Sequence, residues 1–484
     1  MTATADRKLN LVGGEWRDAS GSLDVRDPTD ERAVIGSVPA MDAADVAAAY
    51  DAAAAGFETW RATSSVVRGR VLLKAAVLLR ERRDEIARGL TREMGKLLGE
   101  ASVEVDKSAD FFEYYGGLGR AGRGEMLAHE RADVTAYTLH EPLGVVLAIT
   151  PWNDPLLTPA RKLAPALIAG NAVVLKPASH TPLIALELAS VLHDAGLPAG
   201  VVNTVTGSGA AIGDALLEHP ALRAVSFTGS NEVGAGIERT LAGRGVGLLA
   251  ELGGKNAAIV LADADVEKAA DTIAAAAFAQ AGQRCTATSR VIAERAVVAP
   301  LVAALKARAE RFVLGSGLDQ GTTMGPLVAG SQRDDVLGFV ERAVADGAQL
   351  ATGGERPADE ARVHGCWVTP AVLTDVDPAS EIWTEEVFGP VVAVVAADDE
   401  AHALALLNDS RYGLAAAIYT NDAGAVQRFV AGAETGQVAV NLPTSGWDVH
   451  MPFGGWKASG SGHKEQGLEG LEFYRRTKTV AIAP

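Results

Sequence analysis

Three residues of this chain have the chemistry of an active site that works through a covalent intermediate. Cys285, in "AGQRCTATSR" (281–290), carries a thiol whose ionised form is a strong nucleophile. Glu251, in "LLAELGGKN" (248–256), is a candidate general base. Asn153, in "TPWNDP" (150–155), carries an amide that can donate a hydrogen bond to a developing oxyanion.

Each of the three also has a structural interpretation, which the residues alone leave open. Cys285 could be a small buried hydrophobic side chain. Glu251 could pair with Lys255 or face solvent at the glycine turn that follows it, and Asn153 could cap a helix before Pro155.

A glycine turn provides a further candidate site. In "FTGSNEVG" (227–234), Gly229 and Gly234 lie between an expected strand and an expected helix, where backbone N–H groups and the helix dipole favour a phosphate. The stretch lacks the full dinucleotide-binding fingerprint, so by itself it is a weak signal.

The elements that position these residues follow an α/β pattern. Apolar, β-branched runs predict strands, and longer amphipathic segments between them predict helices, as in a parallel sheet covered on both faces. The expected strands of a first doubly wound unit are 144–150, 171–177, 200–207 and 223–229, with helices over 155–170, 181–196 and 210–220 between them and over 43–60 and 71–95 upstream. Ligands of such a unit usually bind beyond the carboxyl ends of the strands.

A second α/β unit is expected from about 255 to 440. Its strands are predicted at 256–264, 289–294, 367–376 and 390–397, and its helices at 299–312 and 334–347. Two polar, alternating segments, 133–144 and 472–482, suit strands of an extension that pairs with another subunit, although surface hairpins of a monomer would have the same pattern.

Size and composition favour an enzyme of two or three structural units. The chain has 484 residues and a formal net charge of −17, which disfavours nonspecific binding to nucleic acid or anionic lipid. We find no apolar stretch of the roughly 18 residues that a membrane-spanning helix needs, and no secretory signal. With two cysteines and nine scattered histidines, we expect no disulfide framework, no metal site and a cytoplasmic location.

The chain resembles the aldehyde dehydrogenase superfamily over nearly its whole length. The motifs that carry the resemblance occur in the family's order: "TPWNDP", "GNAVVLKPASHTP", "SFTGSNEVG", "AELGGKN", "AGQRCTATSR", "EEVFGPVVAV", "NDSRYGLAAAIYTND" and "MPFGGWKASG". The resemblance implies that Cys285 is the nucleophile, Glu251 the general base and Asn153 the oxyanion donor. It also implies a cofactor-binding domain (1–122 and 143–253), a catalytic domain (254–455) and a small β oligomerisation extension (123–142 and 468–484) of a homodimer or homotetramer.

By the same resemblance, the cofactor is NADP or NAD, bound by Thr150, Trp152, Lys176, Ser179, Gly209, Gly229, Ser230, Val233, Leu252, Glu386 and Phe388. Many NAD-preferring relatives have Glu three residues after the lysine, where this chain has Ser179. A hydroxyl beside Lys176 can donate to a 2′-phosphate that a carboxylate would repel, so we expect NADP to be preferred. Alternatively, Ser179 only fills the loop and NAD is used equally well.

The substrate residues implied are Arg161, Thr158, Trp447 and Phe453. Residues 154, 158 and 161 fall at helical spacing, and relatives acting on succinic semialdehyde have an arginine at the position of Arg161. The stretch "NLPTSGWDVHMPFGG" (441–455) is similar to 2-oxoglutarate semialdehyde dehydrogenases. A small aldehyde bearing a carboxylate is therefore expected, unless Arg161 pairs with Asp154 instead.

Two rival functions remain open at this stage. A thiol hydrolase that needs no cofactor would use the same Cys285, Glu251 and Asn153, and a catalytically silent binding protein could retain the fold. Aldehyde-dependent formation of reduced cofactor separates both rivals from a dehydrogenase.

Overall fold

The computed structural model describes residues 6–122 and 124–484. Its first large sheet has five parallel strands in the order β10-β9-β8-β11-β12. The bounds are β8 (Val145–Ile149), β9 (Ala172–Lys176), β10 (Val202–Thr204), β11 (Leu222–Thr228) and β12 (Gly247–Glu251). The four strands predicted from sequence are all present, and β12 completes the sheet.

Helices cover both faces of this sheet because its strands are apolar on both faces. Val146 and Ala148 of β8 belong to one core, and Val145 and Leu147 belong to the opposite one. The first core contains α2 (Ser65–Glu81), α3 (Arg83–Met94), α4 (Leu98–Gly117), α5 (Leu157–Ala169) and α6 (Pro182–Asp194). The second contains α1 (Ala43–Ala62), α7 (Gly209–Glu218) and α8 (Asn231–Leu241). This two-sided covering is the doubly wound arrangement expected from the sequence.

The single helix predicted over 71–95 is wrong, because the segment forms two helices. The backbone leaves the helical region at Arg82 (φ −95°, ψ 11°), where α2 ends and α3 begins. Asp84 and Glu85 in the first turn of α3 favour a helix start, since acidic side chains stabilise a helix N-terminus.

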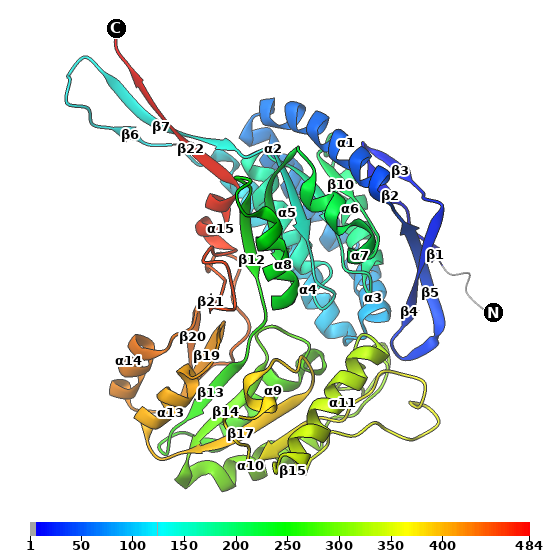
Figure 1. Cartoon of the computed structure of the whole chain (residues 1–484), viewed down its shortest axis with the longest axis vertical. Coiled ribbons are helices and arrows are strands. Elements are labelled where there is room, and N and C mark those ends of the chain that lie inside the picture. Colours follow the sequence, from blue (N-terminus) through cyan, green and yellow to red (C-terminus); the bar gives the residue numbers. More distant parts are fainter. Residues whose placement is uncertain (1–5, 123) are drawn as a thin grey trace.

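The second large sheet has seven strands in the order β15-β16-β17-β14-β13-β19-β20, parallel except for the pairing of β15 with β16. The bounds are β13 (Asn256–Val260), β14 (Thr288–Glu294), β15 (Gln349–Thr352), β16 (Ala371–Thr374), β17 (Val391–Ala397), β19 (Ala415–Tyr419) and β20 (Gln437–Val440). One face carries α9 (Val266–Phe278) and α10 (Arg295–Ala309), and the other α11 (Gly330–Ala345), α12 (Glu381–Thr384), α13 (Glu400–Asn408) and α14 (Ala423–Gly432). Figure 1 shows this sheet in the lower half of the molecule and the first sheet in the upper half.

The two polar segments predicted as strands pair with each other. β7 (Thr135–Pro142) lies between β6 (Met126–Leu127) and β22 (Arg475–Ile482), and all pairings are antiparallel. The resulting extension projects from the body of the molecule (Figure 1). The last strand begins at Arg475 rather than at residue 472, because α15 (Gly467–Phe473) precedes it.

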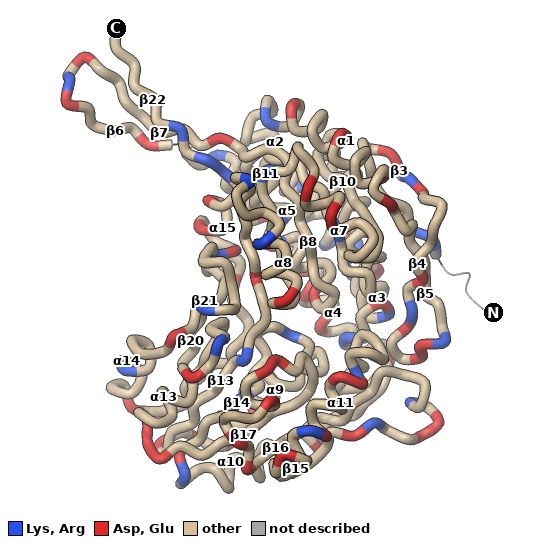
Figure 2. Tube along the Cα trace, viewed as in Figure 1, with Lys and Arg blue, Asp and Glu red and all other residues tan. Residues whose placement is uncertain are grey.

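Smaller elements complete the fold. They are β1 (Asp6–Arg7), β2 (Asn10–Val12), β3 (Glu15–Arg17), β4 (Gly21–Asp27), β5 (Asp30–Ala40), β18 (Tyr412–Gly413) and β21 (Trp456–Lys457), with short 3-10 turns at Leu118–Arg120 and Ala279–Gly282. Asp and Glu are interspersed with Lys and Arg over both halves (Figure 2). In the part of the chain that the structure describes, we find no helix that is long and apolar enough to span a membrane.

After β20 the chain returns to the first sheet. Leu252 N donates to Ser459 O at 3.0 Å, and Glu251 forms an isolated β-bridge with Gly460. Farther along, Asn171 Nδ2 donates to Tyr474 O at 2.8 Å. This returning segment, residues 453–474, therefore packs against a sheet whose own strands lie earlier in the chain, between Val145 and Glu251.

Candidate active site

A cavity of about 470 Å³ lies where the two large sheets meet. It is lined from the first sheet by residues that follow β8, β11 and β12, at the carboxyl ends of these strands, and from the second by residues that precede β14 and β17. Cys285, Glu251 and Asn153 all line this cavity. The structure thus brings together the three residues that the sequence singles out.

Cys285 lies in the segment between α9 and β14, and the side chain of Asn256 fixes the backbone of this segment. Asn256 Nδ2 donates to the carbonyls of Cys285 and Ala287, each at 2.8 Å. Burial raises the pKa of the Cys285 thiol to about 12, and the charge of Arg161 counteracts this only partly. The thiol needs further activation before it becomes a nucleophile at neutral pH.

The residues just before this segment have an unusual backbone. Gln280, Ala281 and Gly282 all have positive φ, at 52°, 54° and 72°. A Cβ atom at Gly282 would collide with the carbonyl oxygen of Gly389, so only glycine fits there. The two neighbours that are not glycine are strained, and such strain persists only where surrounding contacts enforce it.

Asn153 is buried and does not cap a helix, so that alternative is wrong. Helix α5 begins at Leu157, and a carboxylate oxygen of Glu104 accepts hydrogen bonds from the first free N–H groups, those of Leu156 (2.9 Å) and Leu157 (3.1 Å). One N–H of the Asn153 side chain donates to Gln283 O at 3.0 Å. An amide has two such hydrogens, so one remains for a ligand in the cavity.

Glu251, the last residue of β12, is 3 % exposed, and neither of its carboxylate oxygens has a hydrogen-bond partner among the described residues. Burial and then the nearby Glu465 raise the pKa of Glu251 well above its ordinary value. Its predicted alternatives are wrong: it is not solvated, and Lys255 is buried apart from it, where desolvation lowers the Lys255 pKa to about 7. A carboxylate in this environment is suited to accept a proton from a water molecule near neutral pH.

Sequence reasoning missed two buried charges beside Glu251. Lys162 and Glu465 form an ion pair, and their side chains are 0 % and 3 % exposed. Lys162 Nζ also donates to Ser226 Oγ at 3.0 Å. Burial lowers the Lys162 pKa, and Glu465 offsets only part of that effect. The signal for this pair was Lys162 itself, which the apolar residues 163–169 of α5 follow directly.

The expected substrate residues Arg161, Thr158, Trp447 and Phe453 all line the cavity. The Arg161 guanidinium lies 4.9 Å from the centre of the Phe453 ring and 5.8 Å from that of Phe111. Its nearest carboxylate is Glu465, at 3.6 Å, whereas Asp154 binds Lys96 at 3.0 Å. The alternative pairing of Arg161 with Asp154 is therefore wrong: α5 begins only at Leu157, so Asp154 is not on its helical face.

Six of the residues expected to bind the cofactor line the same cavity. They are Trp152, Gly229, Ser230, Leu252, Glu386 and Phe388. The rings of Trp152 and Phe388 meet edge to face at 5.2 Å. Glu386 Oε1 accepts a hydrogen bond from Gly254 N at 2.9 Å.

The remaining expected cofactor residues lie outside the cavity wall, at the carboxyl ends of the same strands. Thr150 follows β8, and Lys176 is the last residue of the neighbouring strand β9. The Lys176 ammonium has no partner among the described residues, although the residue is only 9 % exposed. The Thr150 hydroxyl is likewise buried and unpaired. Gly209 begins α7, Val233 lies in the first turn of α8, and exposed Ser179 donates to Gly207 O at 3.4 Å. Unpaired buried donors next to a helix N-terminus fit a ligand with ribose and phosphate groups.

Comparison with known proteins agrees with this geometry. A family model described as "Aldehyde dehydrogenase family" matches residues 16–480. The chain is 43% identical over 478 residues to an alpha-ketoglutarate semialdehyde dehydrogenase of Haloferax volcanii, covering 98% of this chain and 99% of that protein. It is 38% identical over 478 residues to an alpha-ketoglutaric semialdehyde dehydrogenase of Bacillus subtilis, covering 98% of each.

The fold also matches solved structures. Betaine aldehyde dehydrogenase from Staphylococcus aureus in complex with NAD+ superimposes with a TM-score of 0.96 and 35% sequence identity. The match covers 98% of this chain and 95% of that one. The expected two-sheet fold is thereby confirmed.

Proposed function

The chain belongs to the aldehyde dehydrogenase family, and from this premise we propose that it oxidises a small aldehyde bearing a carboxylate. The leading substrates are 2-oxoglutarate semialdehyde and succinic semialdehyde. The observation that carries the proposal is Arg161, a cation whose side chain is 12% exposed, which lies in the wall of the cavity that holds Cys285 and forms no ion pair with Asp154. The names of the two relatives point to the first of these substrates.

In the proposed mechanism the thiolate of Cys285 attacks the aldehyde carbon. A carbon–sulfur bond forms, and the carbonyl oxygen becomes an alkoxide that the free N–H of Asn153 and the Cys285 amide stabilise. A nicotinamide cofactor, which Trp152, Glu386 and Phe388 would help to hold, would supply the acceptor for the hydride of this carbon. The carbonyl re-forms and leaves a thioester on Cys285.

Water then releases the product from the thioester. Glu251 takes a proton from the water, the resulting hydroxide adds to the thioester carbon, and the carbon–sulfur bond breaks to give the carboxylic acid and the Cys285 thiolate. The raised pKa of Glu251 supports this role, because a stronger base removes the water proton more readily.

For the cofactor, we propose NADP in preference to NAD. Ser179 carries a hydroxyl at the position where many relatives that prefer NAD carry a glutamate, and the Lys176 ammonium three residues earlier has no partner among the described residues. Neither group repels a 2′-phosphate. The betaine aldehyde dehydrogenase from Staphylococcus aureus was solved with NAD+. The proposed preference for NADP over NAD therefore concerns this chain and does not extend to that protein. In this proposal residues 1–122 and 143–253 hold the cofactor and 254–455 carry the nucleophile.

We also propose that the protein is a homodimer or homotetramer assembled through residues 123–142 and 468–484. β22 pairs with β7 on one side only, so a row of backbone donors and acceptors remains for another strand. Met126 and Ile482 of this extension are 72% and 53% exposed, which supports burial against a partner. Both cysteines are unpaired, and this supports a reducing compartment such as the cytoplasm.

A panel of aldehydes assayed with both cofactors tests the proposal. Succinic semialdehyde and 2-oxoglutarate semialdehyde are compared with uncharged aldehydes of the same length, and reduced cofactor is followed by its absorbance. We expect the highest kcat/KM for a carboxylated aldehyde with NADP. A preference for the uncharged aldehydes would refute the substrate class, and ester hydrolysis without any aldehyde oxidation would favour a hydrolase.

A further inference from the structure

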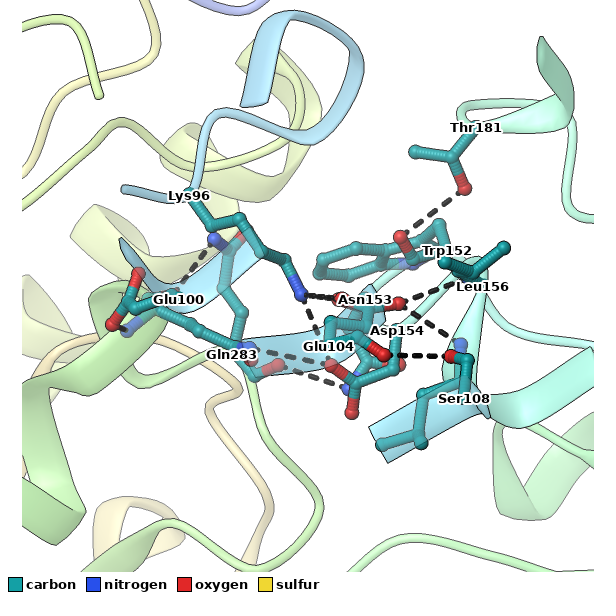
Figure 3. A network of polar contacts seen from close by, with 12 residues as sticks. Lys96, Glu100, Glu104, Ser108, Trp152, Asn153, Asp154, Leu156, Thr181 and Gln283 are labelled. Carbon is teal, nitrogen blue, oxygen red and sulfur yellow. Dashed lines mark hydrogen bonds and ion pairs between the residues drawn. The ribbon is translucent and has the colours of Figure 1, made fainter. Parts of the chain in front are cut away.

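A closed ring of hydrogen bonds connects the turn that carries Asn153 to the segment that leads to Cys285. Lys96 Nζ donates to Asn153 O at 2.9 Å and to Asp154 Oδ1 at 3.0 Å (Figure 3). Asp154 Oδ1 also accepts from Gln280 Nε2 at 3.3 Å. Gln283 Nε2 donates to Gln280 O at 3.0 Å, and Asn153 Nδ2 donates to Gln283 O at 3.0 Å, which closes the ring.

A buried ion pair between Lys96 and Glu104 stabilises the ring. The Lys96 and Glu104 side chains are 0% and 2% exposed, and Glu104 binds the Lys96 ammonium as well as the first turn of α5. Burial lowers the pKa of Lys96, but Glu104 and Asp154 raise it by more, so the ammonium stays charged. All three of its hydrogens are used, by Glu104, Asp154 and the Asn153 carbonyl.

The other side of the ring restrains a strained backbone. Gln280 and Ala281 have left-handed backbone angles without being glycine, and they lie five and four residues before Cys285. Gln280 is fixed at its amide by Glu100, whose Oε1 accepts from Gln280 N at 2.8 Å, and at its side chain by Asp154. Without Asp154, this segment keeps only the hydrogen bond from Asn153 Nδ2 to Gln283 O as a side-chain contact with the Asn153 turn, and the strained residue Gln280 loses its own.

We propose that Lys96 and Asp154 are positioning residues, which hold the oxyanion donor Asn153 at a fixed distance from Cys285. The inference rests on the proposed function, because it takes Asn153 as the donor. Asp154 then acts through Asn153 and Gln280 rather than on the substrate, although its side chain is one-fifth exposed to the cavity. The two groups that must converge on one carbonyl come from different sheets, and the ring is what sets their separation.

The consequence for catalysis is a selective loss of rate. A displacement of about 1 Å in a catalytic group costs about 100-fold in rate, because the hydrogen bond to the transition state is misaligned while substrate binding persists. Opening the ring should therefore slow thioester formation without changing KM.

The test compares Asp154→Ala with Asp154→Asn in stopped-flow measurements of the first turnover. Both ring contacts of Asp154 end on Oδ1, which asparagine retains and alanine lacks. We expect the burst of reduced cofactor to be about 10- to 100-fold slower in Asp154→Ala, with KM unchanged, and close to wild type in Asp154→Asn. A raised KM with an unchanged burst would show that Asp154 binds substrate and would overturn the proposal.

Glu104→Gln and Glu93→Gln form a matched pair that separates positioning from stability. Glu93 is buried and caps α6 through Leu183 N (2.6 Å) and Ile184 N (3.0 Å), as Glu104 caps α5, but it does not contact the ring. We expect both variants to melt at lower temperature and only Glu104→Gln to slow the burst, by about tenfold. Equal slowing in both would overturn the proposal.

Asn153→Ala distinguishes a failure of the proposed function from a failure of the positioning role of Lys96 and Asp154. If the proposed function is correct, this variant slows the burst by about 100- to 1,000-fold, as the loss of an oxyanion donor does. If Asn153→Ala has no effect, the proposed function fails. If Asn153→Ala is slow and Asp154→Ala is not, the positioning proposal alone fails.

Discussion

Replacement of Arg161 by methionine tests how the cavity recognises its substrate. Methionine keeps an apolar stem that can pack against Phe453 and Phe111, so the variant removes the charge with little loss of packing. Because a charge-assisted hydrogen bond contributes about 1.5–3 kcal/mol, we expect kcat/KM for succinic semialdehyde to fall about 10- to 150-fold.

The structure sets where in that range the loss should fall. Among the described residues, only the Glu465 carboxylate lies within 4 Å of the Arg161 guanidinium, at 3.6 Å, and Glu465 also binds Lys162. The guanidinium therefore has no close hydrogen bond to a carboxylate of the protein and can form one with a ligand. Since its side chain is only 12% exposed, solvent screens the interaction weakly, and a loss in the upper half of the range is expected.

The assay must separate substrate recognition from effects on the nucleophile. The charge of Arg161 lowers the pKa of Cys285, so its removal also slows attack by this thiolate on any aldehyde. We therefore compare succinic semialdehyde with butanal, which has the same chain length and no carboxylate, and take the ratio of the two losses. Equal losses on both aldehydes would refute the assignment of Arg161 as the anchor.

A second variant, Lys107→Met, tests whether another cation of the cavity wall binds the substrate carboxylate. Lys107 lines the cavity but is 43% exposed and pairs with Asp448 at 3.2 Å. We expect its loss to change the two aldehydes alike. A selective loss on succinic semialdehyde would assign the anchor to Lys107 instead.

Four further outcomes follow from the site and the fold. In Glu251→Gln, the burst of reduced cofactor should persist while steady turnover falls about 100-fold or more, and unaffected turnover would exclude Glu251 as the base. In wild type, where the pKa of Glu251 is raised, deacylation-limited turnover should keep rising with pH above the ordinary carboxyl range; a plateau below pH about 5 would contradict this. Alkylation of Cys285 in the cofactor-free enzyme should rise about tenfold per pH unit between pH 7 and 10, because its thiol pKa lies at about 12, and a plateau in that range would contradict the burial argument. Ser179→Glu should shift the ratio of NADP to NAD activity toward NAD, and an unchanged ratio would remove Ser179 from cofactor choice.

Local patterns predicted the elements of the first sheet well. Its strands are short β-branched runs bounded by Gly or Pro, and the residues at their ends, such as Asn153 and Glu251, meet at one edge because parallel strands share a direction. The prediction that Cys285 is the nucleophile, by contrast, depended on the resemblance to a family, since one cysteine carries little information by itself.

The parts that could not be predicted depend on contacts between distant segments. Lys96 lies 57 residues before Asn153, and Glu465 lies 303 residues after Lys162, so no local pattern joins them. The alternative pairing of Asp154 with Arg161 arose because helical spacing was extended three residues before α5 begins. A difference of one turn in a helix boundary decides which cation a carboxylate can reach.

The return of residues 453–474 to the first sheet limits how this enzyme can be recombined with its relatives. A chimera that joins the first half of one homologue to the second half of another near residue 254 would separate Lys162 from its own Glu465 and Leu252 from its own Ser459. The modular unit for engineering is therefore discontinuous: the segment after Pro452 has to be inherited together with the first sheet, while the seven-stranded sheet between them can be exchanged as an insert.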